Sequence, residues 1–144
     1  MGKNIIDQNL FKLIHYNDCM KYIFDKDLVM EVNSKQDIPK KVGSKFLMDV
    51  HGNGCGWCVK DVPNVQNVCK DLKNNNVQCL GLDIHTKNGK KAMKEIGMNV
   101  RGTPAKFLCE VIEVNNEKQL DCSMHRGYSS EKELRDKVKA KGFL

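Results

Sequence analysis

The chain has 144 residues, with 24 Lys or Arg against 18 Asp or Glu, and a formal net charge of +6. A chain of this length can bury one substantial hydrophobic core, and no apolar run approaches the ~20 residues that cross a bilayer, so we expect a domain that does not span a membrane. The positive charge comes from scattered lysines without interleaved aromatic residues, which predicts a solvated surface and not a nucleic-acid interface.

Cysteine usage predicts a reducing compartment. The sequence holds 7 cysteines, an odd number, and its first residues contain no apolar signal stretch. We expect Cys69, Cys79 and Cys109 to be small buried side chains, because they fall in apparent core strands and helices. Cys19 and Cys122 cannot be placed. The expected location is the cytoplasm, or a virion if the heavy use of lysine and asparagine reflects the AT-rich genome of a large DNA virus.

Residues 1–43 carry weak structural signals. Apolar residues between positions 6 and 14 have helical spacing, and residues 28–32 are compatible with a short strand. A Pro and a Gly then mark a break before residue 44. We interpret 1–43 as an N-terminal extension that packs on or precedes the domain formed by 44–144.

From residue 44 the pattern alternates between strands and helices. Residues 45–50 form an apolar strand, and 59–73 have the pattern of a helix. A second buried strand is expected over 77–83, after a polar Asn run. Residues 88–97 form a further helix that ends at its last residue, a glycine.

The last third of the chain predicts a hairpin and a helix. Two strands, 105–112 and 118–125, are joined by a turn at Asn115-Asn116. The final helix begins with a capping box from Ser130 to Glu133 and ends near Gly142. The order of elements predicts an α/β fold in which a central sheet, part parallel and part antiparallel, is flanked by helices.

Cys55 and Cys58 form a Cys-x-x-Cys motif that opens the first of these helices, directly after a buried strand. The spacing lets both sulfurs meet across one helical turn, and this arrangement is typical of a redox-active disulfide. The helix N-terminus leaves backbone N–H groups pointing at the first sulfur, which favours its thiolate. We expect Cys55 to attack a substrate disulfide and Cys58 to resolve the mixed disulfide.

Two other interpretations of this motif stay open. The cysteines could be half of a structural zinc site, but tetrahedral zinc needs two further ligands, and the sequence shows neither a second Cys-x-x-Cys nor a His pair at ligand spacing. We therefore expect no metal. The pair could also be vestigial and have no redox activity.

Further landmarks stand at fixed distances from the motif. Asp49 precedes Cys55 by six residues, and Pro63 follows Cys58 by five. Arg101-Gly102-Thr103-Pro104 precedes the expected hairpin, and Gly127-Tyr128-Ser129-Ser130 precedes the last helix. With Cys55-Gly56-Trp57-Cys58, these landmarks resemble the thioredoxin family over about 100 residues, 44–144.

The resemblance implies a role for the acid behind the cysteines. Asp49 would be a buried general base that exchanges a proton with Cys58. From the residues alone it could equally be a solvated charge at the end of a strand. His51 stands where the family usually has an aromatic residue, and either tunes the thiolate or is a packing or surface residue.

The resemblance also implies a substrate-binding surface. Pro104 would follow a cis peptide bond, exposing the Thr103 backbone so that a substrate segment can pair with it as an extra strand. Gly127 begins the segment that is expected to lie beside Pro104. Gly54 replaces the usual Trp before the first cysteine, and Trp57 between the cysteines is expected to be an exposed platform for substrates.

The sequence thus predicts a thioredoxin-like thiol–disulfide oxidoreductase that reduces protein disulfides through Cys55 and Cys58. It would need no cofactor beyond that disulfide, take electrons from a reductase or another dithiol, and act as a monomer. Two alternatives remain. One is a binding or structural module with the same fold and no turnover, and the other is a disulfide oxidase or isomerase, which would differ in reduction potential.

Overall fold

The computed structural model describes residues 24–144. Five strands form one sheet in the order β1-β3-β2-β4-β5. Strands β1, β3 and β2 are parallel, whereas β4 and β5 are antiparallel to their neighbours. The strands are β1 (Met30–Glu31), β2 (Lys45–His51), β3 (Val77–Asp83), β4 (Ala105–Val114) and β5 (Glu117–Arg126). The predicted mixed sheet is confirmed, and the helical spacing expected between residues 6 and 14 lies outside the described residues.

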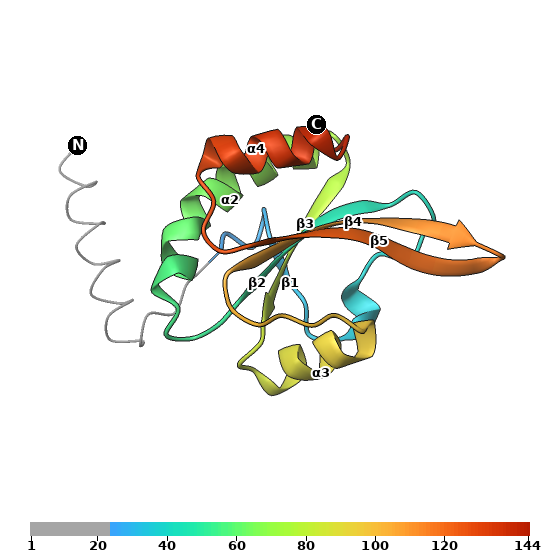
Figure 1. Cartoon of the computed structure of the whole chain (residues 1–144), viewed down its shortest axis with the longest axis horizontal. Helices are drawn as coiled ribbons and strands as arrows, with labels where there is room; N and C mark the ends of the chain where they lie inside the picture. The colour runs from blue at the N-terminus through green and yellow to red at the C-terminus, as the bar shows by residue number, and fades with distance from the viewer. Residues whose placement is uncertain (1–23) are drawn as a thin grey trace.

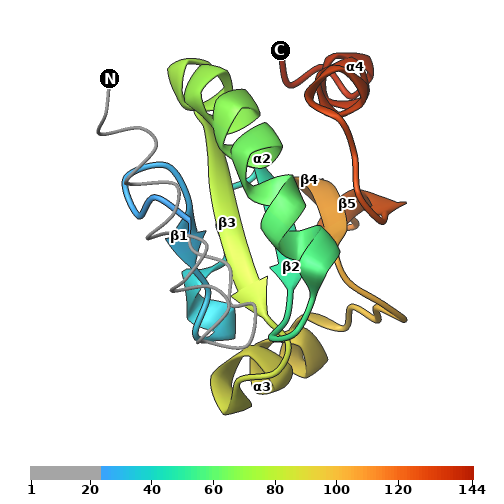
Figure 2. The same cartoon turned by 90° about the vertical axis from the view of Figure 1, so that its left-hand side faces the viewer.

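Helices cover both faces of the sheet (Figures 1 and 2). Helices α2 (Gly56–Asn74) and α4 (Glu131–Ala140) lie side by side on one face, and α3 (Lys87–Ile96) covers the other, next to the short 3₁₀ helix η1 (Lys35–Asp37). The end of α3 and the start of α4 agree with the capping signals in the sequence. Gly97 adopts a left-handed conformation after α3, and α4 begins with the expected capping box of Ser130 and Glu133.

The core has one layer on each side of the sheet because β2 is central and buried on both faces. Leu47 packs with the inner sides of α2 and α4, whereas Phe46 and Met48 point to the α3 side. Every residue of β2 after Lys45 is buried. The sheet therefore holds the C-terminal end of β2, and the loop that follows it, in a fixed position at the start of α2.

Residues 24–43 contribute to the same sheet and core. Strand β1 pairs with β3, and Val29 and Val32, on either side of it, are buried in opposite layers. The described part of the expected N-terminal extension therefore packs on the 44–144 domain as its edge strand.

Two further disulfides correct the sequence-based interpretation of the cysteines. Cys69 of α2 is bonded to Cys79 of β3, and Cys109 of β4 to Cys122 of β5. The burial of Cys69, Cys79 and Cys109 is confirmed, and their disulfide bonds are a feature that the sequence analysis did not predict. Neighbouring elements bring each pair together: Cys109 and Cys122 stand directly opposite each other in the hairpin. The compartment inferred from cysteine usage stays a prediction.

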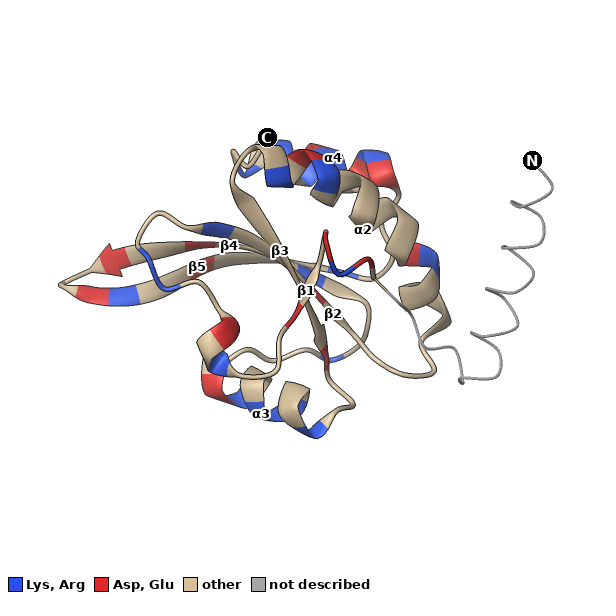
Figure 3. Cartoon of the chain, turned by 180° about the vertical axis from the view of Figure 1, so that it is seen from behind, with Lys and Arg blue, Asp and Glu red and all other residues tan. Residues whose placement is uncertain are grey.

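Charged side chains are spread over the surface of the described chain. Figure 3 shows Lys and Arg on α3, α4 and the hairpin, with Asp and Glu interspersed on α4. On α4, Arg135 pairs with Glu131 and with Asp71 of α2 at 3.0 and 2.5 Å. The Arg135–Asp71 pair attaches α4 to α2 at a solvated face, whereas the Arg135–Glu131 pair lies within α4.

Candidate active site

The Cys55–Cys58 disulfide stands at the N-terminus of α2. Cys55 is the N-cap residue, and its sulfur accepts a hydrogen bond from the Cys58 backbone N–H at 3.1 Å. Cys58 is only 2% exposed, whereas Cys55 is half-buried. The N–H group that the sequence placed near the first sulfur is thus aimed at it, and this sulfur is the more accessible of the two.

A shallow groove of ≈ 310 Å³ lies beside the disulfide. Four of the five expected substrate-binding residues line it, Trp57, Thr103, Pro104 and Gly127, together with Tyr128. The Thr103–Pro104 peptide bond is cis, as the resemblance implied. Gly54 does not line the groove; it is exposed in the preceding loop, with a φ of 75°.

Two aromatic rings form one wall of the groove. Trp57 is 57% exposed, and its ring lies 5.6 Å from that of Tyr128, centroid to centroid. The Lys60 ammonium stands 4.6 Å from the Trp57 ring centroid, in cation–π range. The Tyr128 hydroxyl accepts a hydrogen bond from Asn64 of α2 at 3.1 Å. Tyr128 was not predicted as a site residue, although it directly follows Gly127.

Asp49 lies on β2 beneath α2 and is 2% exposed. Burial raises the pKa of its carboxyl well above the usual range, the nearby Asp61 raises it further, and Lys106 opposes the shift. Its Oδ1 atom has no hydrogen-bond partner among the described residues. The solvated alternative for Asp49 is therefore wrong, and its part in proton transfer stays a prediction.

A buried ion pair that the sequence analysis missed stands next to Asp49. Lys106 of β4 is opposite Asp49 in the sheet register, is 0% exposed, and donates a hydrogen bond to the Asp61 carboxylate of α2. Its ammonium also donates to the Gly127 carbonyl oxygen at 2.7 Å. Asp61 in turn accepts from the Ser129 N–H at 3.2 Å. One buried pair thus holds the 127–129 loop against the redox helix.

The chain offered a signal for this pair. Lys106 interrupts the apolar first half of β4, residues 105–109, and a lysine buried there needs an anionic partner. Nothing in the sequence identifies that partner as Asp61, because a single Asp in a helix usually faces solvent.

His51 is buried at the end of β2, beside Glu31 and Phe24. Burial, with a smaller effect from His85, lowers the pKa of His51 to about 2. Its Nε2 atom is 3.6 Å from a Glu31 carboxylate oxygen, but an uncharged imidazole makes no ion pair with it at neutral pH. Burial and the charge of Asp83 raise the pKa of Glu31 to about 7. His51 is therefore a buried residue and not a surface one, and its part in tuning the thiolate stays a prediction.

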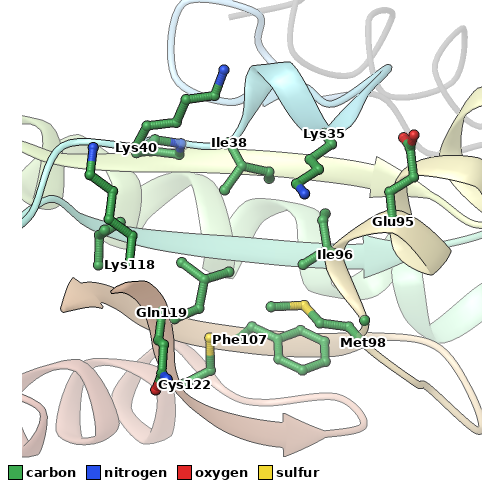
Figure 4. A pocket seen from close by; sticks show the side chains of 14 residues that line it. Lys35, Ile38, Lys40, Glu95, Ile96, Met98, Phe107, Lys118, Gln119 and Cys122 are labelled. Atoms are coloured by element: carbon green, nitrogen blue, oxygen red, sulfur yellow. The ribbon is translucent and has the colours of Figure 1, made fainter. Parts of the chain in front are cut away.

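A second groove, of ≈ 510 Å³, lies away from Cys55 and Cys58 (Figure 4). It is bounded by η1, the end of α3 and the β4–β5 hairpin, and Cys122 is part of its lining.

Within residues 24–144 no three side chains of His, Cys, Asp or Glu gather as a metal site. No described helix is both long and apolar enough to cross a bilayer.

Comparison with known proteins identifies the architecture. No family model and no curated protein matches the sequence. Among solved structures, thioredoxin f from spinach chloroplast is 22% identical, with a TM-score of 0.56, over 78% of this chain and 91% of its own. Thioredoxin O2 from Arabidopsis thaliana is 10% identical (TM-score 0.58; 82% and 97%), and Trichomonas vaginalis thioredoxin 17% (0.54; 82% and 99%). The chain has the thioredoxin fold.

Proposed function

We propose that this chain is a thiol–disulfide oxidoreductase that reduces disulfides in protein substrates. The observation that carries the proposal is the Cys55–Cys58 disulfide at the N-terminus of α2, with the accessible sulfur beside a groove. The fold shared with thioredoxins supports the same class of reaction.

Two exchange steps account for the reaction. The Cys55 thiolate attacks one sulfur of the substrate disulfide, which forms a mixed disulfide and releases the other substrate sulfur as a thiolate. The Cys58 thiolate then attacks the Cys55 sulfur, releasing the second substrate sulfur and leaving the Cys55–Cys58 disulfide that the structure contains. The Cys58 N–H, 3.1 Å from the Cys55 sulfur, supports negative charge there.

Asp49 supplies the proton acceptor for the second step. Cys58 is buried, so its thiol reaches water poorly and needs a base to become a thiolate. Asp49 is buried beneath the same helix, and its raised pKa makes it a far better base than an exposed aspartate. The same proton returns when the disulfide is reduced again.

The groove provides the substrate-binding surface. An extended substrate segment pairs with the exposed backbone at Thr103, and its side chains contact the Trp57–Tyr128 wall. Electrons come from a reductase or a dithiol partner, and the disulfide is the only redox group required. The active unit in this proposal is a monomer located in a reducing compartment.

Reduction of insulin disulfides by a dithiol donor tests the proposal. The wild-type chain should accelerate insulin precipitation, and Cys58→Ser should abolish turnover while trapping mixed disulfides through Cys55. Cys55→Ser is the matched control, because it keeps the buried thiol and loses the accessible one. If the wild type leaves the insulin rate unchanged, the proposed reduction of protein disulfides is wrong. Equal trapping by both variants would reverse the order of the two sulfurs.

Equilibration of Cys55 and Cys58 with glutathione buffers separates a reductase from an oxidase or isomerase. A reductase keeps this pair oxidised until the buffer is strongly reducing, with a potential near −270 mV, whereas an isomerase lies near −180 mV and an oxidase near −120 mV. Mass spectrometry of the alkylated peptides measures the redox state of this pair separately from that of the other two disulfides. A potential near −120 mV would overturn the reducing direction and leave the chemistry intact.

A further inference from the structure

The disulfide between Cys109 and Cys122 stands in a different environment from that between Cys69 and Cys79. Cys69 and Cys79 are both buried, in the layer between α2 and the sheet. Cys109 is also buried, on the opposite side of the sheet, but Cys122 is half-buried and lines the ≈ 510 Å³ groove. Figure 4 shows its side chain next to Phe107 on the hairpin side of that groove.

This asymmetry selects one sulfur for attack. Thiol–disulfide exchange needs an incoming thiolate to reach a disulfide sulfur. The Cys122 sulfur faces the groove, whereas the Cys109 sulfur is enclosed by the α3-side core. An external thiolate therefore bonds to Cys122, and Cys109 is the leaving group.

The groove around Cys122 favours a negatively charged ligand. Its charged lining residues are Lys35, Lys40, Lys118 and one acid, Glu95. Lys118 and Cys122 are four residues apart on β5, so they project from the same face of the strand. The floor is apolar, with Ile38, Met98 and Phe107. A volume of ≈ 510 Å³ is in the range that accommodates a small molecule.

We propose that Cys109–Cys122 is a second thiol–disulfide exchange site, at which the lysine-rimmed groove takes an anionic low-molecular-mass thiol. This site is independent of the function proposed for Cys55 and Cys58. A net negative tripeptide thiol such as glutathione has the required charge and size.

The exchange is balanced without another reactant. The glutathione thiolate attacks Cys122, the Cys109–Cys122 bond breaks, and Cys109 leaves with the electron pair and takes a proton from solvent. A second glutathione thiolate attacks the mixed disulfide, giving glutathione disulfide and a Cys122 thiol after protonation. Two glutathione molecules are oxidised and one protein disulfide is reduced.

The test uses the full chain with Cys19→Ser, Cys55→Ser and Cys58→Ser, so that only the two other disulfides remain. Oxidised protein is incubated with glutathione, quenched in acid, alkylated and analysed by peptide mass spectrometry. We expect a glutathionyl group on Cys122, and opening of Cys109–Cys122 about tenfold or more faster than opening of Cys69–Cys79.

Charge selectivity distinguishes a groove that binds the glutathione carboxylates from a disulfide that is merely accessible to any thiol. Glutathione diethyl ester carries the same thiol without the two carboxylates, and at equal thiolate concentration it should react about 3- to 10-fold more slowly at low salt. Lys40→Gln with Lys118→Gln should reduce the glutathione rate towards the ester rate. Lys70→Gln, on an exposed position of α2, is the matched control and should leave the rate unchanged.

Three results would each overturn the proposal. They are opening of both disulfides at one rate, a glutathionyl group on Cys109 instead of Cys122, and equal rates for glutathione and its ester. None of them bears on insulin reduction by Cys55 and Cys58, so failure here leaves the proposed function standing.

Discussion

Asp49 is a buried acid whose ionised form destabilises the fold. Its pKa is raised in the folded chain above the unfolded value near 4, so folding is not penalised at lower pH, where the carboxyl is protonated in both states. The penalty grows as the pH rises from about 4 and levels off above the folded pKa. Lys106 reduces this penalty without removing it, because its ammonium is already hydrogen-bonded to Asp61.

Asp49→Asn should therefore stabilise the chain in a pH-dependent way. We expect the variant to match the wild type near pH 4 and to exceed it by roughly 1–3 kcal/mol at pH 8, since the amide needs no ionisation. Urea unfolding at a series of pH values measures the difference. A difference that stays constant with pH would mean that Asp49 titrates as an exposed aspartate does.

The same substitution should slow the resolving step most near neutral pH. An Asn cannot take the Cys58 proton, and the rate recovers as rising pH ionises that thiol without help. Stopped-flow reduction of a model disulfide from pH 6 to 9 tests this with wild type and Asp49→Asn. Parallel profiles would remove Asp49 from the proposed mechanism and leave it a structural residue.

Lys106 and Asp61 depend on each other because both are buried. Lys106→Met should destabilise the chain by about 3–5 kcal/mol, because it leaves the Asp61 carboxylate buried without its cation. The double variant Asp61→Leu with Lys106→Met should recover most of that loss. It should still fall short of the wild type by roughly 1–3 kcal/mol, since the Gly127 carbonyl and the Ser129 N–H lose their partners.

Urea unfolding of the four members of this double-mutant cycle gives the coupling between the two residues. Lys132→Met is the matched control, because its ion pair with Asp136 is solvent-exposed on α4. If Lys106→Met is as stable as the wild type, the buried pair does not hold the 127–129 loop.

At the residue scale, prediction succeeded where one residue's neighbours are set by the local chain. The cysteines and the helix N-terminus are linked by three residues of sequence, so their geometry could be derived. Asp61 and Lys106 are 45 residues apart, and Cys109 and Cys122 meet only through hairpin register. Such pairs depend on tertiary placement, which local patterns do not contain.

At the element scale, the start of α3 packs against the end of β3 only because residue 89 is a glycine. A Cβ added to Gly89 would lie 1.8 Å from the Asp83 carbonyl oxygen, which is backbone and cannot rotate away. Gly89→Ala should therefore displace α3 and destabilise the chain by roughly 1–3 kcal/mol or more. Thermal unfolding followed by circular dichroism measures the loss.

Gly102→Ala is the control for this prediction. A Cβ at Gly102 meets nothing within 4 Å, and its φ is not in the left-handed region. We expect its melting temperature to match that of the wild type. Equal melting temperatures for Gly89→Ala and wild type would show that α3 does not pack closely on β3.

Elements with strong local signals were predicted with nearly correct bounds. Strand β3 has the predicted range, and Asn115 and Asn116 adopt the positive φ values, 53° and 65°, that a two-residue hairpin turn requires. Helix α2 begins at Gly56, three residues before its predicted start, because the Cys55 sulfur serves as the N-cap acceptor. The pattern of apolar residues alone placed the start at residue 59, whereas the Cys-x-x-Cys motif, which was expected to open this helix, agrees with the observed start.

At the scale of the whole molecule, the two faces of the sheet are covered unequally. Within residues 24–144, α2 and α4 enclose one face, whereas α3 and the single turn η1 are the only helices on the other (Figure 1). The Cys122 groove lies on this second side, between η1, the end of α3 and the hairpin. The resemblance implied the thioredoxin fold but could not show this opening, because the short η1 gave no periodic signal in the sequence.

The Cys69–Cys79 and Cys109–Cys122 disulfides lie on opposite faces of this sheet and should contribute separately to stability in their oxidised form. They close loops with sequence separations of 10 and 13, for which the chain-entropy model gives ~3 kcal/mol each. Cys69→Ala with Cys79→Ala, and Cys109→Ala with Cys122→Ala, should each yield a folded but weaker chain.

Removing both disulfides together should bring the chain close to unfolding. The two losses lie on different layers of the core, so they should add to about 6 kcal/mol, which is comparable with the 5–15 kcal/mol that stabilises a typical domain. Urea titration should then show a transition for each double variant and little or no folded baseline for the quadruple variant. A quadruple variant as stable as the wild type would mean that packing alone, without either covalent link, holds α2 and β5 to the sheet.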